Sequence, residues 1–380
     1  MSLFKRKNRK NDEKLVQTAG RNYSASLGMF LNKGNIRAEH RLYKSLRENV
    51  PVIDAAVCKL VRLAGGFVIK CGDKDKEDDI NYFLRNVNVN GLQSGIDSFL
   101  SIFLDQLITY GTAIGEIVLD KTGTNIAALY NASLDDVELG MGDNPLDIRI
   151  ISCDSQGNRC EVKYPSLVIC GTILNEPGRI YGNSVLRGLP FVCDIIGKIF
   201  TAIGTNWDRV GNVRFAVSYK PSESDRSFSK ERAQQIASEW SKAMNSTQPR
   251  DFVSVGDVSV SVIGADNQIP DSQVPVRLLL EQIVSKLSVP PFLLGLSWSS
   301  TERMSAQQAD ILTSELEYYR RILNSAITKI CDTYFKLNSV NTRFEIVWDN
   351  INLQDEVELA KARLLNAQAM QIENKLERND

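Results

Sequence analysis

Apolar residues recur with a helical period over several long stretches of this 380-residue chain. The most regular stretch, 304–335, predicts a long helix with one apolar face, because apolar side chains return every three or four residues. Those positions are Leu312, Leu316, Tyr319, Leu323, Ile327, Ile330 and Tyr334. The same period predicts further helices at 52–60, 95–110, 185–207, 229–244 and 272–287, and one that begins at Asn352.

Between the helices, apolar and polar residues alternate as they do in half-buried strands. The expected strands are 113–119, 126–130, 148–153, 160–164, 167–170, 213–220, 252–255, 258–263 and 343–348. Helices and hairpins in this order predict an α+β fold with an antiparallel sheet and a small β-α-β-β insert.

Pro290 and Pro291 interrupt the pattern between two predicted helices. Proline lacks the backbone N–H and clashes with the preceding turn, so the helix that ends near Leu287 cannot continue through this pair. A polar stretch that contains Trp298 follows before the next helix begins. The pattern therefore predicts a loop that is held out between two rigid helices.

The charge balance and the cysteine pattern limit which kinds of partner, disulfide and metal site the sequence is compatible with. The chain has 45 Lys and Arg residues against 46 Asp and Glu residues, so its overall charge does not call for a polyanionic partner. Seven cysteines without a C-x-x-C pair are typical of reduced thiols. Cys153 and Cys160 could face each other in a hairpin, but two thiolates without histidine partners do not complete a zinc site.

The first 35 residues are polar and start with a basic run. A disordered tail is the favoured interpretation, and a contact with nucleic acid or a scaffold is the alternative. The most apolar window, 189–203, carries Asp194 and Lys198, which makes it unsuitable for crossing a bilayer. No apolar signal segment follows the basic start, so a protein without a membrane segment is expected.

Motifs of enzymes are missing from the sequence. No G-x-x-x-x-G-K-[ST] phosphate loop and no H-E-x-x-H metal motif occurs, and the single histidine, His40, is expected at the surface. We therefore expect no catalytic residues, no metal and no cofactor.

Gly197, Gly204 and Gly211 lie seven residues apart in the predicted helix after 185, which places them on one side. A glycine costs about 1 kcal/mol in a helix interior relative to alanine. Close approach of a neighbouring helix would explain the row. The alternative is that the glycines arose by neutral drift and are tolerated without a structural role.

Four stretches resemble the portal proteins of tailed bacteriophages, in the branch with HK97-like heads. They are the helix at 49–69, the helix-glycine-strand step at 103–118, the segment IYGNSVLRGLP at 180–190, and LLLEQIVSKLSVPPFLLGLS at 278–297. The last is the most specific, because it is closest to the family's helix followed by VPP-x-L-L-G. Together the four stretches span most of residues 40–350.

The resemblance implies a homo-oligomeric ring, usually of about twelve subunits, at one vertex of the capsid. Double-stranded DNA would pass through its channel without sequence preference during packaging and ejection. The implied partners are the terminase large subunit, the head–tail adaptor, and the major capsid and scaffold proteins. The implied location is the virion, with assembly in the cytoplasm of the bacterial host.

The family's parts can be placed on this sequence, giving a wing of mixed helices and antiparallel strands, a helical stem, a small α/β clip and a short C-terminal crown helix. The implied ranges are tail 1–35, wing 36–188 and 304–350, stem 189–211 and 265–289, clip 212–264, tunnel loop 290–303, and crown 351–380.

The resemblance also implies roles for individual residues. The tunnel loop would present Ser297, Trp298, Ser299, Ser300, Thr301, Glu302 and Arg303 to the DNA. Hydroxyl groups could bind phosphates, and Trp298 could either act as a bulky stop or pack under the long helix. The clip's partner surface would include Lys220, Arg226, Lys230 and Arg232, although a solvated face is the alternative.

Two other classes of protein remain open at this point. One is a non-viral α+β scaffold or assembly protein, and the other is a capsid-associated nuclease or NTPase. The missing phosphate loop and acid cluster argue against the enzyme.

Overall fold

A computed structural model describes residues 36–142, 147–153, 158–211, 214–219, 258–263, 272–296 and 302–351, with a few helical positions between 231 and 238. The chain divides into two compact units. The first is Met1–Phe191 with Ile283–Asp380, and the second is Val192–Gln282. Along the sequence, the second unit is therefore an insertion into the first.

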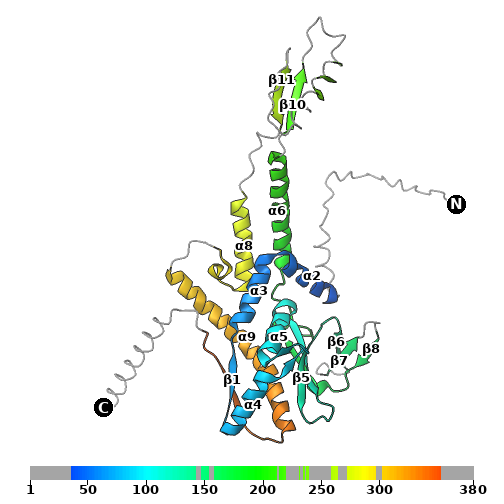
Figure 1. The fold of residues 1–380 in the computed structure, drawn as a ribbon, viewed down its shortest axis with the longest axis vertical. Helices are drawn as coiled ribbons and strands as arrows, with labels where there is room; N and C mark the ends of the chain where they lie inside the picture. Colours follow the sequence, from blue (N-terminus) through cyan, green and yellow to red (C-terminus); the bar gives the residue numbers. More distant parts are fainter. Residues whose placement is uncertain are drawn as a thin grey trace, which may run out of the picture. The chain divides into compact units, whose positions relative to one another are not determined.

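The first unit is built on a group of helices shown in Figure 1. They are α2 (Ile36–Asn49), α3 (Pro51–Leu63), α4 (Lys74–Asn86), α5 (Ile96–Tyr110) and α9 (Glu302–Leu337). The long helix predicted near 304–335 is thus confirmed, and six of its seven predicted apolar positions are buried. Tyr334, the seventh, is half-buried and stacks on Phe83 with 4.5 Å between the ring centroids.

A five-stranded sheet in the order β3-β2-β5-β4-β9 packs against α5. Its strands are β2 (Asn88–Val89), β3 (Gln93–Ser94), β4 (Thr112–Leu119), β5 (Ile126–Ala132) and β9 (Val168–Thr172). All neighbours are antiparallel except β2 and β5. Gly115 allows α5 to lie directly on the sheet, because a Cβ there would be 2.5 Å from the Phe99 ring.

A second sheet contains β6 (Val137–Met141), β7 (Ile148–Cys153) and β8 (Arg159–Glu161). The strands β7 and β8 pair as the sequence predicted, but the two cysteines that could have faced each other across this hairpin do not. Cys153 lies opposite Arg159, and Cys160 lies opposite Ser152. Since neighbouring residues of a strand point to opposite faces, the one-residue offset separates the two thiols.

The strand β1 (Phe67–Cys71) pairs antiparallel with β12 (Phe344–Trp348), so segments far apart in the sequence meet in a two-stranded sheet. Arg320 secures this junction from α9. Its Nε donates to the carbonyl of Ala64 at 2.7 Å, and its guanidinium lies 5.0 Å from the centre of the Trp348 ring. The predicted strand at 343–348 is confirmed, whereas its partner strand β1 was not predicted.

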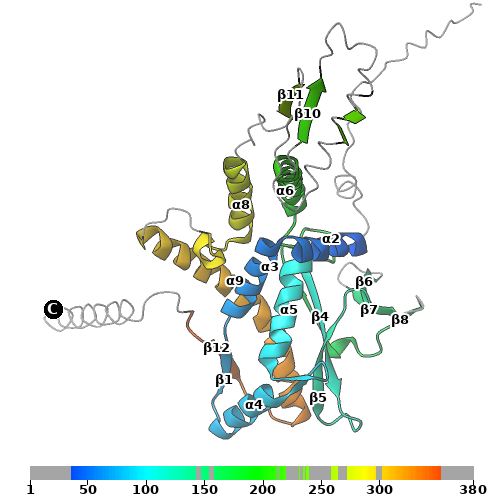
Figure 2. The same ribbon diagram turned by 45° about the horizontal axis from the view of Figure 1, so that its top comes forward.

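The second unit contains most of α6 (Leu189–Gly211), the antiparallel pair β10 (Arg214–Tyr219) and β11 (Val258–Ile263), and most of α8 (Gln273–Leu287). Figure 2 gives a second view of these elements. The predicted helix at 272–287 and the strand at 258–263 are confirmed, as is the strand predicted at 213–220 over its described residues 214–219. The helix predicted at 185–207 is present but begins at Leu189 and ends at Gly211, because residues 185–188 form turns.

Three predicted elements fall wholly or largely outside the described residues. They are the strand at 252–255, the helix at 229–244, of which only a few positions are described, and the helix from Asn352.

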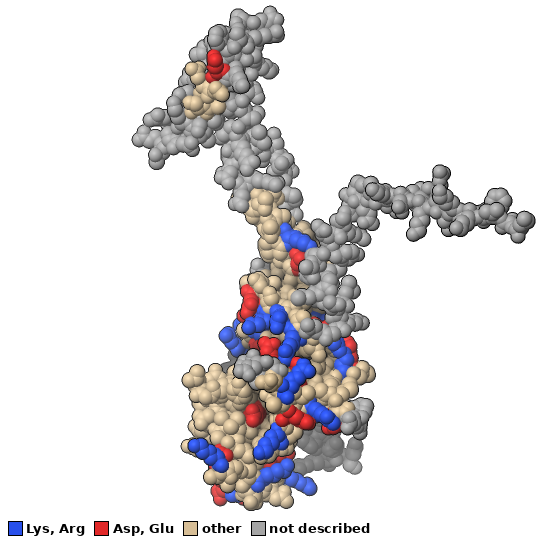
Figure 3. All heavy atoms as spheres, turned by 90° about the vertical axis from the view of Figure 1, so that its right-hand side faces the viewer, with Lys and Arg blue, Asp and Glu red and all other residues tan. Residues whose placement is uncertain are grey.

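None of the described helices is long and apolar enough to cross a membrane. On the face drawn in Figure 3, Lys and Arg side chains are interspersed with Asp and Glu side chains. Positive and negative charges are thus nearly balanced on that face as well as in the whole sequence, and no large patch of one sign covers its described part.

Candidate functional site

The segment after α8 is a sharp, internally bonded turn. Ser288 has a φ of 54°, and the 3-10 turn η3 (Pro291–Leu294) ends at Gly295 with a φ of 73°. Backbone hydrogen bonds of 3.1 and 3.2 Å from Leu296 and Gly295 close the turn. The two prolines thus follow the end of α8 as predicted. The hydrogen-bonded turn at 291–296 sets the direction in which the chain enters the polar stretch that follows.

The turn η3 packs against α3, and Val289 beside it is only 1% exposed. The next helix, α9, begins at Glu302, so Glu302 and Arg303 belong to its first turn. Arg303 is exposed. The other predicted tunnel-loop residues lie outside the described part of the chain, namely Ser297, Trp298, Ser299, Ser300 and Thr301. The structure therefore describes both supports of this loop.

The lead-in to α6 is fixed to the end of α5. Ser184 donates from its hydroxyl to the carbonyl of Thr109 at 2.6 Å, and the Val185 N–H donates to the carbonyl of Ile108 at 3.1 Å. Gly111 ends α5 in the left-handed conformation, with a φ of 79°. A side chain at Gly111 would collide with the backbone of Asn183, so glycine is needed there. In the helix-glycine-strand step at 103–118, the glycine is thus required because the backbone of Asn183 packs directly against Gly111.

The glycine row on α6 has no close neighbour in the described chain. A Cβ at Gly197 or Gly204 would meet nothing within 4 Å. Gly211 is the last residue of the helix. Lys198 is exposed and pairs with Asp194 one turn earlier at 2.6 Å. The described residues of one chain thus include no helix whose approach would require these glycines, and both interpretations of the row remain predictions.

The apolar stripe of α6 is covered at one end only. Leu189 and Ile196 are buried, whereas Phe200 and Trp207 are 55% and 62% exposed. Positions 196, 200, 203 and 207 follow the helical period, so one stripe runs from the buried end to the exposed end. Large aromatic side chains on an exposed helix face are typical of surfaces that contact another molecule.

The residues predicted for the clip surface cannot be placed. Lys220, Arg226, Lys230 and Arg232 all lie outside the described residues. The strands β10 and β11, between which they fall along the chain, are paired over six residues. Their partner role stays a prediction.

A charged network that the sequence did not reveal joins α2, α3 and α5. Arg47 donates through Nη1 to both carboxylate oxygens of Asp105 at 2.6 and 2.7 Å and to the Thr109 hydroxyl at 2.8 Å. Its Nε and Nη2 bind Asp54 Oδ1 at 2.9 and 2.7 Å. Burial lowers the pKa of Arg47, but the hydrogen bonds and charges of Asp105 and Asp54 outweigh it and raise the pKa overall.

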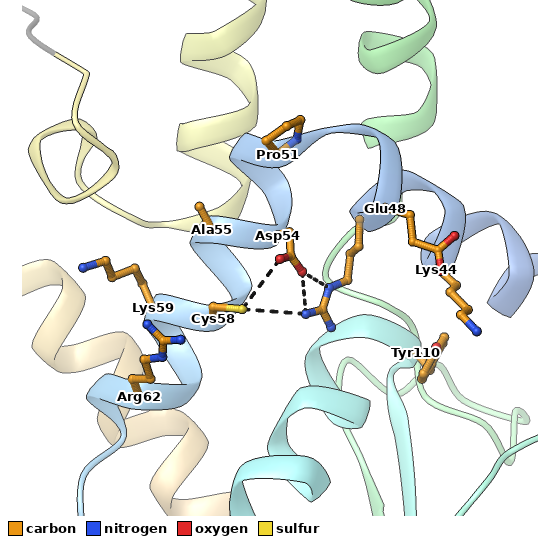
Figure 4. A pocket seen from close by; sticks show the side chains of 10 residues that line it. Lys44, Glu48, Pro51, Asp54, Ala55, Cys58, Lys59, Arg62 and Tyr110 are labelled. Carbon is orange, nitrogen blue, oxygen red and sulfur yellow. Dashed lines mark hydrogen bonds and ion pairs between the residues drawn. The ribbon is translucent and has the colours of Figure 1, made fainter.

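This network lies beside an open pocket of about 750 Å³ (Figure 4). Exposed side chains of Lys44, Glu48, Lys59 and Arg62 line it together with Tyr110. The positions of Arg47 and Asp54 on either side of Pro51 could have indicated their ion pair. Asp105, however, comes from a helix that is distant in the sequence. The pocket was therefore not predictable as a unit.

His40 is buried, which corrects its expected surface position. Only 8% of it is exposed, and its ring lies 5.0 Å from that of Tyr110. Burial lowers the pKa of His40 to about 4, although the charge of Asp135 raises it in part. The expectation failed because α2 packs against α3 and α5, so that a polar sequence has an inner face.

The described residues contain no group of three or more His, Cys, Asp or Glu side chains that could hold a metal ion. The features that the described residues do show are an exposed aromatic stripe on α6, the two supports of the predicted loop, and a pocket with a charged rim.

Neither a protein-family model nor a curated protein matches the sequence. Solved structures do match the fold. The neck of an empty GTA particle, computed with C6 symmetry, aligns with a TM-score of 0.64 at 14% identity over 89% of this chain and 92% of that chain. The neck of a native GTA particle, computed with C12 symmetry, aligns with a TM-score of 0.62 at 14% identity, over 86% and 88% of the two chains.

An HK97-family phage portal protein from Corynebacterium diphtheriae also matches, with a TM-score of 0.42 at 13% identity over 82% of this chain and 95% of that chain. The two GTA matches each cover most of this chain. They show the fold, and the α+β architecture inferred from the sequence is confirmed.

Proposed function

We propose that this chain is the subunit of a portal ring in a phage-like particle. Copies would surround a channel for double-stranded DNA, and the chain itself would perform no catalysis. The exposed end of the α6 stripe carries this proposal, because Phe200 and Trp207 have little cover from the described residues of a single chain. The fold, shared over most of its length with chains of GTA particles, supports it.

The assignment of parts follows from the resemblance. The helices α6 and α8 would form the stem, residues 212–264 the clip, and residues 290–303 the tunnel loop. The stem would cover 189–211 and 265–289, the wing 36–188 and 304–350, and the crown helix 351–380. A ring of identical subunits uses two different surfaces of each copy, and the likeness to a GTA neck computed with C12 symmetry is in keeping with such a ring.

The proposed partners have separate places on the chain. The clip would face the terminase large subunit and later the head–tail adaptor, and the wing would face the capsid and scaffold proteins. Contacts with DNA would be few, sequence-independent and weakened by salt, because the chain's charge is nearly balanced. The location would be the capsid vertex of the virion.

Electron microscopy of the purified protein tests the proposal. We expect annular particles with a central hole. Persistent monomers or open filaments at high protein concentration would contradict it and would favour a scaffold protein of another kind. Turnover of added DNA or ATP would favour the enzyme.

Deleting residues 297–301 tests the loop separately. Its two supports, η3 and α9, have their own backbone hydrogen bonds, so the deletion should leave ring formation intact. In particles, packaging or retention of DNA should be reduced. Normally filled heads from this deletion would contradict the role of the loop.

A further inference from the structure

The outer face of α3 is the strongest site that the proposed function leaves unexplained. This helix buries Ile53, Ala56, Val57 and Leu60, while the side chains of Lys59 and Arg62 are exposed. These two cations line the pocket beside Arg47.

The rim of the pocket carries an excess of positive charge. Lys44, Lys59 and Arg62 are exposed there. The acids beside them are Glu48 and the partly exposed carboxylate of Asp54, which is already paired with Arg47. Within the described part of the chain, none of these three cations takes part in an ion pair, whereas Arg47 is already paired with Asp54 and Asp105. The rim can therefore receive a carboxylate without losing an existing partner.

Pro51, Ala55 and Tyr110 add apolar surface to the same pocket. Pro51 and Ala55 are exposed and small, so an approaching helix could come close to α3 at this point. The pocket thus combines an apolar wall with a basic rim.

The outer face of α9 has the complementary features. Ile311 is 64% exposed, and Ser314 and Glu317 follow it at three-residue steps and are exposed as well. Glu317 makes no ion pair within 4.0 Å with the described residues, although its charge acts on Arg320 one turn later. Ser314, in the middle, is small, which again permits close packing.

The two faces are different surfaces of the subunit. The pocket lies among α2, α3 and the end of α5, whereas positions 311, 314 and 317 belong to α9, which passes behind α3 in Figures 1 and 2. Two different surfaces on one subunit are what head-to-tail association requires. A face that bound itself would instead give a closed pair.

We propose that the α9 face of one copy sits in the α3 pocket of the next copy. Glu317 would lie between Lys59 and Arg62, and Ile311 would pack against Pro51 and Ala55. This inference rests on the proposed ring and names one of its subunit contacts. The occupant is a second copy of this chain, because the two faces complement each other in charge and both present apolar surface and a small residue.

Charge reversal with mixing tests the contact. Variant one carries Lys59→Glu and Arg62→Glu, and variant two carries Glu317→Lys. Each alone brings like charges together, so its association constant should fall by about tenfold or more. Mixed in equal amounts, the variants offer each other opposite charges at both contacts. The mixture should regain association to within about threefold of the unmodified chain, read by sedimentation velocity at two salt concentrations.

Two matched controls use exposed charges away from both faces, Lys121→Glu between β4 and β5 and Glu161→Lys on β8. They should associate like the unmodified chain. All substituted positions are exposed, so circular dichroism should show an unchanged fold.

The contact is wrong if either reversed variant associates normally, or if mixing gives no recovery. Association of the unmodified chain without closed rings would contradict the portal proposal alone, and the mixing experiment would still report on this contact. An unmodified chain that stays monomeric would overturn both.

Discussion

The helices α9 and α6 have similar sequence patterns and different surroundings. On α9 the stripe that includes Leu312, Leu316 and Leu323 is buried by the chain's own elements. On α6 the stripe is buried at Ile196 and open at Trp207. A helical period of apolar residues predicts that one face of the helix is buried. It does not predict whether the same chain or another molecule buries that face.

This difference between the two helices suggests separate roles in the stability of the subunit and in the association of subunits. Side chains of α9 should determine whether the subunit folds, and the exposed part of α6 should determine whether subunits associate. Substitutions can break or sharpen this division, and those with the largest effects come first.

Leu316→Ala should have the largest effect on folding. The side chain is fully buried, and truncating a buried leucine costs about 3 to 5 kcal/mol of the free energy of unfolding. Urea unfolding of the monomeric chain measures the loss. Phe200→Ala is the matched control on α6, where we expect less than about 1 kcal/mol because the side chain is half in solvent. Equal losses would remove the contrast between the helices.

His40 should make the first unit sensitive to acid. Its pKa is about 4 in the folded chain and 6.5 as the ordinary value, so the unfolded chain binds the proton first as the pH falls. Stability should be fully present above pH 6.5, should decrease between 6.5 and about 4, and should level off below. The full loss is about 3 kcal/mol.

Urea unfolding from pH 7 to pH 4 measures this, with His40→Phe as the comparison. Phenylalanine cannot titrate, so its curve should lack the part of the slope that belongs to His40. Identical slopes for the two chains would contradict the assignment.

Gly197→Ala should produce a smaller effect of opposite sign. A Cβ there meets nothing within 4 Å, and alanine favours a helix over glycine by about 1 kcal/mol, so the subunit should become more stable. If the glycine row serves close approach of a second copy, the same change should weaken association. A stabilised chain that associates normally would favour tolerated drift.

Trp207→Ser should have the smallest effect on the subunit. The side chain is 62% exposed, so the free energy of unfolding of the monomer should change by less than about 0.5 kcal/mol. Fewer annular particles should nevertheless form. A large loss of subunit stability would show that the α6 stripe belongs to the fold of one chain.

Strong periodicity made the long elements predictable from sequence. The helices α5, α6, α8 and α9 have apolar stripes of several turns, and proline or glycine lies near the ends of the first three. In contrast, α2 was not predicted, because only His40, Tyr43 and Leu46 of its polar sequence are buried. Their three-residue spacing is helical, but only two of the three side chains are apolar and most of the rest of the segment is charged or polar, so the helix was missed.

Contacts between distant segments could not be predicted. Arg47 reaches Asp105 from another helix, and Arg320 reaches the carbonyl of Ala64, so neither pairing leaves a local pattern. The offset of Cys153 from Cys160 depends on strand register, which the geometry of the turn sets. Of the predicted loop residues 297–303, only the last two are described, at the start of α9.

The pairing of β1 with β12 affects the order of events during synthesis. Cys71 leaves the ribosome long before Phe344, its partner in the sheet. At typical elongation rates of about 5 to 20 residues per second, β1 would wait on the order of tens of seconds. The inserted second unit is made during that wait, so a nascent chain keeps an unpaired strand edge that a neighbouring nascent chain could occupy by mistake.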